Sequence, residues 1–218
     1  MNDIKVLIIA GGPDINEAFL AELASSCDVV ICADSGADHA MELRIVPSRV
    51  LGDLDSISPR GLEYLKGNNV PIEVFPVEKD MTDSELCLTY AIDNYDPATI
   101  IIYSSFKGRF DQLASNVQLA LRYSTPDRNI VLTDGDTEVF PLLEGTGRTL
   151  QVSGNENISV IPVSRELKMG ECNGLYYDLS GLDLHYGSSL SVSNKPSKEA
   201  EMISVMVEKG LGYLVISY

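Results

Sequence analysis

The segment that decides the fold class is Val6-Leu7-Ile8-Ile9-Ala10, which ends in Gly11-Gly12-Pro13. A continuous apolar run of this kind is typical of a strand that is buried on both faces, as in a parallel sheet covered by helices. Apolar residues at helical spacing follow from Ile15 to Leu23. The chain therefore begins with a predicted buried strand and a predicted amphipathic helix, the first unit of an α/β fold.

Strand and helix continue to alternate up to residue 135. Further strands are predicted at Val29–Cys32, Val50–Leu51, Ile72–Phe75, Thr99–Tyr103 and Asn129–Thr133, and helices at 37–43, 58–67, 82–91 and 110–123. Two helix starts carry local signals, because Pro59 follows Ser58 and Glu85 stands three residues after Thr82 in a capping box. We expect residues 1–135 to form an α/β domain with a mostly parallel sheet and helices on both faces.

The texture of the chain changes after Asp134-Gly135. Helical periodicity ends, and short strand-like segments alternate with Gly, Asn and Ser. They are Thr137–Leu143, Arg148–Val152, Ile158–Val163, Ser189–Val192, Ile203–Val207 and Tyr213–Ser217. We expect residues 136–218 to form a second, all-β domain, a small sandwich or barrel.

Charge and composition limit the partners of the protein. The 218 residues carry a formal net charge of −16, which argues against a surface that binds nucleic acid or anionic membranes. No apolar stretch approaches the roughly 20 residues of a membrane-spanning helix, and the start, Met1 to Lys5, has no signal-peptide pattern. We expect a cytoplasmic protein that is bound neither to membranes nor to nucleic acid.

The residues that most often bind zinc or form disulfides are sparse. The four cysteines show no CxxC spacing, and three of them lie in apolar patterns, which predicts buried thiols in a reducing compartment. His39 and His185 are too few and too far apart in sequence for a zinc site.

Four short acidic segments lie at or just beyond the ends of predicted strands. They are Ala33–Ala37 around Asp34, Gly52–Ser56 with Asp53 and Asp55, Lys79–Asp83, and Gly108–Gln112 with Arg109 and Asp111. Because the carboxyl ends of parallel strands meet at one edge of a sheet, where ligands bind, we expect these segments to converge. Carboxylates beside one Lys and one Arg suit a Mg²⁺ ion that bridges to phosphate oxygens.

Each acidic segment also has a purely structural interpretation. Asp53 and Asp55 are typical of a turn whose carboxylates cap their own backbone. Asp83 stands in the first turn of a predicted helix, where acids are routine stabilisers, and Asp111 suits a helix N-cap. Each motif alone is modest, and their joint placement at successive strand ends favours a binding site.

Cationic and hydroxyl side chains accompany these acids. Lys79 and Thr82 stand at a predicted helix start, which attracts phosphate, and Arg109 at the next helix entrance suits bidentate contact with a phosphate. The P-loop, nucleophile-elbow and complete dinucleotide-binding motifs are missing from the sequence. The predicted phosphate site therefore depends on carboxylates, a metal ion and single cations.

In their order, the four segments resemble the motifs of the thiamine pyrophosphokinase family. That family carries ADGGA, GDxDS, (K/Q)DxTD and GRxDH/Q segments in the same order, and here they stand at 33–37, 52–56, 79–83 and 108–112. Near the C-terminus, Gly174–Tyr177 and Ser191–Asn194 are similar to the family's GLKY-like and SxSN-like segments. The resemblance spans almost the whole chain.

The resemblance implies transfer of a pyrophosphoryl group from ATP to the hydroxyl of thiamine, which gives thiamine diphosphate and AMP. It implies direct in-line attack assisted by Mg²⁺, in an N-terminal α/β domain that is followed by a β-sandwich. It also implies that the β-sandwich binds thiamine and forms a homodimer with its two sites between the subunits.

The resemblance also implies roles for single residues. Asp53, Asp55 and Asp83 are implied to hold Mg²⁺ and, with Arg109, to be catalytic; Asp34, Lys79, Thr82, Arg109 and Asp111 to line the nucleotide side; and Ser191, Ser193 and Asn194 to contact thiamine. Three departures from the family pattern stand out. Ser35 replaces a Gly, Gln112 stands where many members have His, and the chain has no Trp to stack on thiamine.

Two other functions are compatible with the same residues. A phosphatase of the haloacid-dehalogenase type would use Asp53 as its nucleophile and Asp55 as its acid/base, although its motif usually follows the first strand rather than the third. A non-catalytic module that senses ATP–Mg²⁺ would use the same acids for binding alone.

Overall fold

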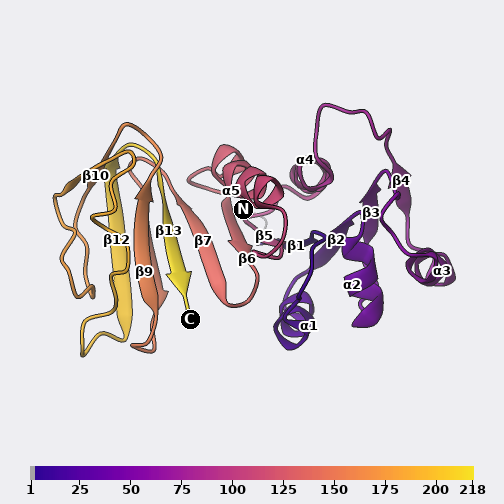
Figure 1. Ribbon diagram of the computed structural model, residues 1–218, viewed down its shortest axis with the longest axis horizontal. Coiled ribbons are helices and arrows are strands. Elements are labelled where there is room, and N and C mark those ends of the chain that lie inside the picture. Colours follow the sequence, from indigo (N-terminus) through magenta and orange to yellow (C-terminus); the bar gives the residue numbers. More distant parts are fainter. Residues whose placement is uncertain (1–2) are drawn as a thin grey trace. The chain divides into compact units, whose positions relative to one another are not determined.

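The computed structural model describes residues 3–218 (Figure 1). Met1 and Asn2 lie outside the described residues. They belong to the predicted α/β domain and to the start of the chain for which no signal peptide is expected. The chain divides into two compact units. The first runs up to Tyr123 and includes Asp127–Gly135, and the second comprises Ser124–Pro126 and Asp136–Tyr218.

The first unit contains a parallel sheet with strand order β4-β3-β2-β1-β5-β6. The strands are β1 (Lys5–Ile9), β2 (Val29–Ala33), β3 (Arg49–Gly52), β4 (Ile72–Val74), β5 (Thr99–Tyr103) and β6 (Asn129–Thr133). The chain adds β2, β3 and β4 on one side of β1 and then returns to add β5 on the other. This reversal beside β1 opens a crevice at the carboxyl ends of the strands, which is where α/β proteins bind ligands.

Helices cover both faces of this sheet (Figure 1). They are α1 (Glu17–Ser25), α2 (Gly36–Glu42) and α3 (Pro59–Gly67) on one face and α4 (Asp83–Tyr95) and α5 (Phe110–Tyr123) on the other. On the first face Leu7 and Ile9 of β1 pack in one apolar cluster with Leu20 of α1 and Leu65 of α3. Val6 to Ile9 are wholly buried, which confirms the prediction of a strand covered on both sides.

The predicted helix starts at Ser58 and Thr82 both form N-caps. The hydroxyl of Ser58 accepts a hydrogen bond from the Gly61 N–H, and that of Thr82 accepts one from the Glu85 N–H at 3.2 Å. The predicted capping box is nevertheless only half formed. The Glu85 carboxylate instead accepts hydrogen bonds from Arg122 and Tyr123 of α5, so it joins the two helices on this face.

The second unit is antiparallel throughout its named strands. One group pairs in the order β7-β13-β9 and the other in the order β11-β10-β12-β8. The strands are β7 (Thr137–Leu142), β8 (Gly147–Gln151), β9 (Asn157–Pro162), β10 (Glu166–Met169), β11 (Asp183–His185), β12 (Met202–Lys209) and β13 (Gly212–Ser217). An α/β domain followed by a small antiparallel β domain is therefore confirmed.

One predicted strand in the second unit is wrong. Residues 189–192 lie in the connection between β11 and β12, and β10 and β11 were not predicted. The apolar residues Leu190 and Val192 are exposed rather than alternating into a core. The buried Ser191 donates a hydrogen bond from its hydroxyl to the Val160 carbonyl, and its own carbonyl accepts one from the Val160 N–H. This segment is therefore tied to β9 at a single residue rather than through a continuous strand ladder.

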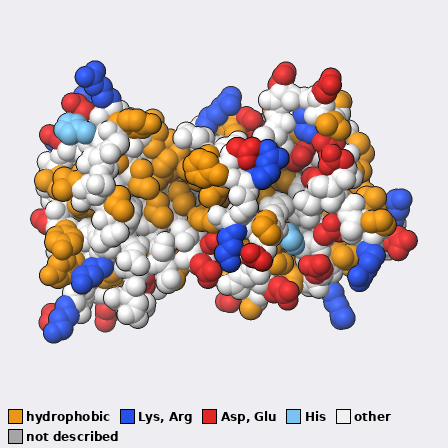
Figure 2. Space-filling view, in the orientation of Figure 1, with side chains coloured by type: hydrophobic (Ala, Val, Ile, Leu, Met, Phe, Trp, Pro, Cys, Tyr) orange, Lys and Arg blue, Asp and Glu red, His pale blue; other side chains and the backbone are white. Residues whose placement is uncertain are grey.

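The remaining sequence expectations concern membranes and thiols. None of the helices among residues 3–218 combines the length and apolar character needed to cross a bilayer. All four cysteines are free thiols; Cys32, Cys87 and Cys172 are buried and Cys27 is partly buried. Figure 2 shows Asp and Glu side chains gathered mostly over the α/β unit on the visible face.

Candidate active site

A pocket of about 590 Å³ lies at the carboxyl edge of the parallel sheet. Its walls come from the segments that follow β1, β2, β3, β4 and β5 and from the N-terminal turns of α4 and α5. Asp34, Asp55, Lys79, Asp83 and Arg109 all line it. The four acidic segments of the sequence therefore do meet at the edge where the strand order reverses.

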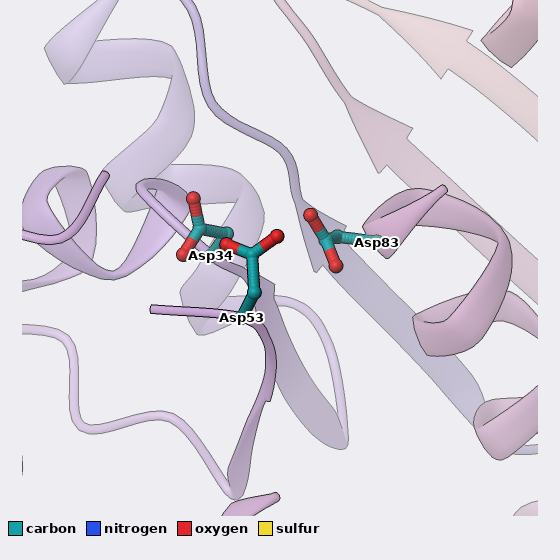
Figure 3. Close-up of side chains that lie close together, drawn as sticks. All are labelled: Asp34, Asp53 and Asp83. Atoms are coloured by element: carbon teal, nitrogen blue, oxygen red, sulfur yellow. The ribbon is translucent and has the colours of Figure 1, made fainter. Parts of the chain in front are cut away.

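Three carboxylates converge beside this pocket (Figure 3). Asp34 follows β2, Asp53 follows β3 and Asp83 is the first residue of α4, and one oxygen from each lies within 4.8 Å of the others. Such a set of hard oxygen donors fits a divalent cation. Asp34 is buried, and its Oδ1 has no hydrogen-bond partner among the described residues, so the cluster keeps one enclosed acceptor available.

Backbone geometry brings Asp34 and Asp53 together. Gly52, at the end of β3, has φ +154°, and a Cβ built on it would lie 2.9 Å from the Cβ of Asp34. Asp34 itself has φ +44°. A glycine is therefore required at position 52, both for its dihedral angle and for the close approach of the two segments.

Lys79 neutralises part of the negative charge of the cluster. Its Nζ lies 3.2 Å from Asp53 Oδ2 and 3.1 Å from Asp83 Oδ1. Partial burial disfavours the charged ammonium, but the hydrogen bonds and charges of Asp83 and Asp53 outweigh this effect and raise the pKa of Lys79. A cation between the carboxylates is thus already favoured by the site.

The carboxylates respond differently to their surroundings. The hydrogen bond from the Asp55 backbone N–H, helped by Lys79, lowers the pKa of Asp53. Burial raises the pKa of Asp83 despite the opposing effect of Lys79. The charge of Asp53 raises the pKa of Asp55, which lines the pocket but does not belong to the group of three convergent carboxylates.

Arg109 and Asp111 form an exposed pair at the start of α5. The guanidinium Nε and Nη2 donate hydrogen bonds to the two carboxylate oxygens of Asp111, at 3.1 Å and 2.5 Å. Asp111 is the second residue of α5 and pairs with Arg109 rather than acting as an N-cap. Arg109 reaches the pocket, whereas Asp111 is not among the residues that line it.

The hydroxyl of Thr82 caps α4, since it accepts a hydrogen bond from the Glu85 N–H. Thr82 also lines the pocket, next to Asp83 at the helix N-terminus. Ser35, which stands where the family has a glycine, has φ −59° and ψ −11°. That is an ordinary right-handed conformation, so the replacement costs no backbone strain.

Ser191, Ser193 and Asn194 lie in the second unit, and each of them makes an internal hydrogen bond. Ser191 and Asn194 do so through their side chains, whereas Ser193 donates its backbone N–H to Ser159 Oγ at 3.0 Å. Ser191 bonds the Val160 carbonyl as described above. Asn194 is buried; its Oδ1 accepts from the Tyr177 N–H and its Nδ2 donates to the Tyr177 carbonyl. This links the two C-terminal motifs of the sequence. Ser193 is exposed and has φ +60°.

Several pocket residues were not predicted from the sequence. Gly11 and Gly12 line the pocket although they complete no dinucleotide-binding motif, and Ser56 donates a hydrogen bond to the Asp34 carboxylate. Ser104 and Asn116 form a buried, hydrogen-bonded pair in the wall. The sequence signal that could have predicted this loop as part of the site is the position of Gly11-Gly12 directly after the first strand.

The fold and the site together define a class: an α/β protein with a cluster of carboxylates and cations at the carboxyl edge of its parallel sheet, extended by a small antiparallel β domain. Residues 20–132 match the catalytic domain of thiamin pyrophosphokinase, and residues 149–211 match the vitamin B1 binding domain of thiamin pyrophosphokinase. The chain belongs to the thiamin pyrophosphokinase family, and its activity is that of a thiamine diphosphokinase.

Individual relatives agree with this placement. The chain is 27% identical over 188 residues to the thiamine pyrophosphokinase of Bacillus subtilis, covering 86% of this chain and 87% of the relative. It is similar to the crystal structure of a Bacillus subtilis thiamine pyrophosphokinase, with a TM-score of 0.84, 25% identity and 98% of each chain covered. The thiamin pyrophosphokinase structure from Candida albicans has a TM-score of 0.80 at 18% identity, over 99% of this chain and 90% of that one, and shows the shared fold.

Proposed function

We propose that the pocket of the α/β unit transfers the pyrophosphoryl group of ATP to the hydroxyl of thiamine, with thiamine diphosphate and AMP as products. The observation that carries this proposal is the convergence of Asp34, Asp53 and Asp83 within 4.8 Å at the switch point of the sheet. Lys79 and Arg109 supply cations in the same pocket. Acids and cations together suit a metal–polyphosphate complex better than a free anion or a free cation.

The donor set fits Mg²⁺. Asp34, Asp53 and Asp83 offer convergent carboxylate oxygens, and the enclosed Oδ1 of Asp34 has no other partner among the described residues. Asp55, two residues after Asp53, is the additional ligand that the family resemblance implies. When bound, Mg²⁺ would neutralise phosphate charge and favour attack on the β-phosphorus.

The side chains around the cluster would hold the phosphates. Lys79 and the N-terminus of α4, which is capped by Thr82, would bind phosphate oxygens, and Arg109 would meet the charge that develops on the leaving group. Asp111 holds the guanidinium of Arg109 through two hydrogen bonds, so its role is to orient that side chain. Most of the acceleration would come from positioning and charge stabilisation, as in phosphoryl transfer generally.

The two units would divide the work between them. The α/β unit, residues 1–135, would bind the nucleotide and Mg²⁺, and the β unit, residues 136–218, would bind thiamine and form a homodimer with sites between subunits. The exposed Ser193 would contact thiamine directly, while the hydrogen-bonded Ser191 and Asn194 would shape its loop. Exposed apolar side chains on the β unit, which suit a protein interface, are Tyr176, Tyr186, Leu190, Val192, Met202 and Met206. The four free thiols favour a reducing, cytoplasmic location.

A single assay tests the proposed reaction. The purified protein is incubated with ATP, Mg²⁺ and thiamine, and the nucleotides are separated by chromatography. AMP that forms only when thiamine is present, in equal amount to thiamine diphosphate, supports the proposal. ADP, or AMP formed without thiamine, contradicts it. ATP binding by calorimetry without turnover would instead favour the sensing module, and a trapped aspartyl phosphate on Asp53 would favour the phosphatase.

A further inference from the structure

His39, in the second turn of α2, is hydrogen-bonded to the loop that follows β1. Its Nε2 lies 2.9 Å from the carbonyl oxygen of Gly12. Because a carbonyl oxygen can only accept, Nε2 carries the hydrogen and donates it. The other ring nitrogen, Nδ1, is buried and has no hydrogen-bond partner within residues 3–218. Within residues 3–218, the hydrogen bond to Gly12 is therefore the one that the imidazole ring makes.

The loop that His39 contacts forms part of the pocket wall. Gly11, Gly12 and Pro13 all line the pocket. A Cβ on Gly11 would lie 2.2 Å from Ser35 Oγ, and a Cβ on Gly12 would lie 2.7 Å from Ser105 Cβ. The loop is thus fitted closely between the segments that follow β2 and β5, the two neighbours of β1 in the sheet.

Glycine lets this loop pack closely against its neighbours and adopt a backbone conformation that other residues avoid. Gly12 has φ +140°, a conformation open mainly to glycine. Two successive glycines also leave the backbone free of side chains, which lets a phosphate approach peptide groups directly. Two successive glycines have many backbone conformations open to them in the unfolded chain, and the hydrogen bond from His39 to the Gly12 carbonyl favours the one seen in the fold.

We propose that His39 is a positioning residue for the nucleoside triphosphate: it holds the Gly11–Pro13 backbone so that the loop presents its peptide groups to the polyphosphate. The inference rests on the proposed function, because it assigns the loop to the ATP side of that reaction. His39 itself touches no reacting atom and acts through Gly12. Its effect therefore falls on ATP affinity and not on thiamine.

The test uses a leucine variant and a matched pair of amides. H39L removes the donor; H39Q places an amide N–H near the position of Nε2; H39N carries the same amide one methylene short of it. H185L, at the exposed histidine of β11, is the control. The Kd for ATP is measured by calorimetry and the KM for ATP and for thiamine by turnover, with thermal unfolding recorded for every variant.

We expect H39L and H39N to raise the Kd and KM for ATP about five- to tenfold, the range expected for loss of one hydrogen bond. The KM for thiamine stays within about twofold, because the bond lies on the ATP side, and H39Q and H185L bind ATP as the wild type does. If H39L fails to fold, the comparison of H39Q with H39N decides.

Wild-type ATP affinity in H39L or H39N, an H39Q variant as weak as H39N, or equal losses for ATP and thiamine would each overturn the inference. Calorimetry reports ATP binding without turnover. A wild-type protein that binds ATP but forms no AMP therefore refutes the proposed function and still leaves His39 testable.

Discussion

Gly52 and Asp34 are in direct contact across neighbouring strands, since a Cβ on Gly52 would lie 2.9 Å from the Cβ of Asp34. This contact sets how closely the turn bearing Asp53 approaches Asp34. The convergence of the three carboxylates therefore depends on the absence of a Cβ atom at position 52.

Gly52→Ala is therefore expected to damage both stability and activity. The added methyl group strains a backbone with φ +154° and pushes Asp34 away from Asp53, which should lower the free energy of unfolding by about 2 kcal/mol. A displacement of this kind should reduce kcat/KM about 10²-fold. Urea unfolding and the AMP assay measure the two effects. Gly67→Ala is the matched control, because nothing lies within 4 Å of a Cβ there; equal losses in both variants would contradict the assignment.

Asp53→Asn and Asp55→Asn are each expected to reduce kcat by at least ~10² while the fold is retained, as when a key charge-stabilising group is lost. Asp93→Asn, at an exposed position on α4, should have no effect. Turnover and circular dichroism are the two measurements. Normal turnover in either site variant would remove that residue from the proposed metal site.

Mg²⁺ should stabilise the folded protein by binding to the carboxylate cluster. At a concentration of ten times its Kd, a ligand that binds only the folded state adds about 1.4 kcal/mol to the free energy of unfolding. We expect a rise in Tm with Mg²⁺ for the wild type and a smaller rise for Asp34→Asn and Asp83→Asn. The readout needs no substrate. An equal Mg²⁺ effect in all three proteins would place the ion elsewhere.

Glu156 should make the β unit sensitive to acid. Its carboxylate is buried and accepts hydrogen bonds from the Ser153 N–H, the Ser153 hydroxyl and the Gly154 N–H at 2.6, 2.8 and 2.9 Å. Burial opposes ionisation, but these hydrogen bonds prevail and lower the pKa of Glu156 to about 2, from its usual 4.5. The ionised form is therefore the one that the fold favours.

Because the folded pKa lies below the unfolded one, this stabilisation is complete above pH 4.5 and is lost as the pH falls towards 2. The loss should be on the order of 3 kcal/mol. Glu156→Gln should be less stable than the wild type at pH 7, and in urea unfolding the gap should narrow as the pH falls from 4.5 towards 2. Glu199→Gln, at an exposed position, should parallel the wild type at every pH. A constant gap between Glu156→Gln and the wild type would contradict the pKa assignment.

Local sequence patterns predicted much of the fold and part of the candidate site. The run Val6–Ala10 and the caps at Ser58 and Thr82 were readable because burial on two faces and helix capping leave signatures within a few residues. Strand pairing leaves no such signature. The segment 189–192 looked like a strand, yet it is tied to Val160 of β9 only through the hydroxyl and the carbonyl of Ser191, which a sequence pattern cannot reveal.

The sequence likewise predicts only part of the site, because the remainder depends on contacts between distant segments. That Asp34, Asp53 and Asp83 share one edge follows from parallel topology alone, but which of Asp34 and Asp55 points toward the other two depends on the φ angles of Gly52 and Leu54. The contribution of Gly11-Gly12 depends on contacts with Ser35 and Ser105, which are distant in sequence.

The position of β1 in the sheet has a consequence for how the chain is made. The strand is translated before β5, with which it pairs; the partner residue of Lys5 is Thr99. During synthesis one apolar edge of β1 must therefore remain unpaired until the residues of β5 have left the ribosome. This long-range closure slows folding and exposes a sticky strand in the meantime. A chaperone that shields nascent β1 would protect this strand until β5 has emerged.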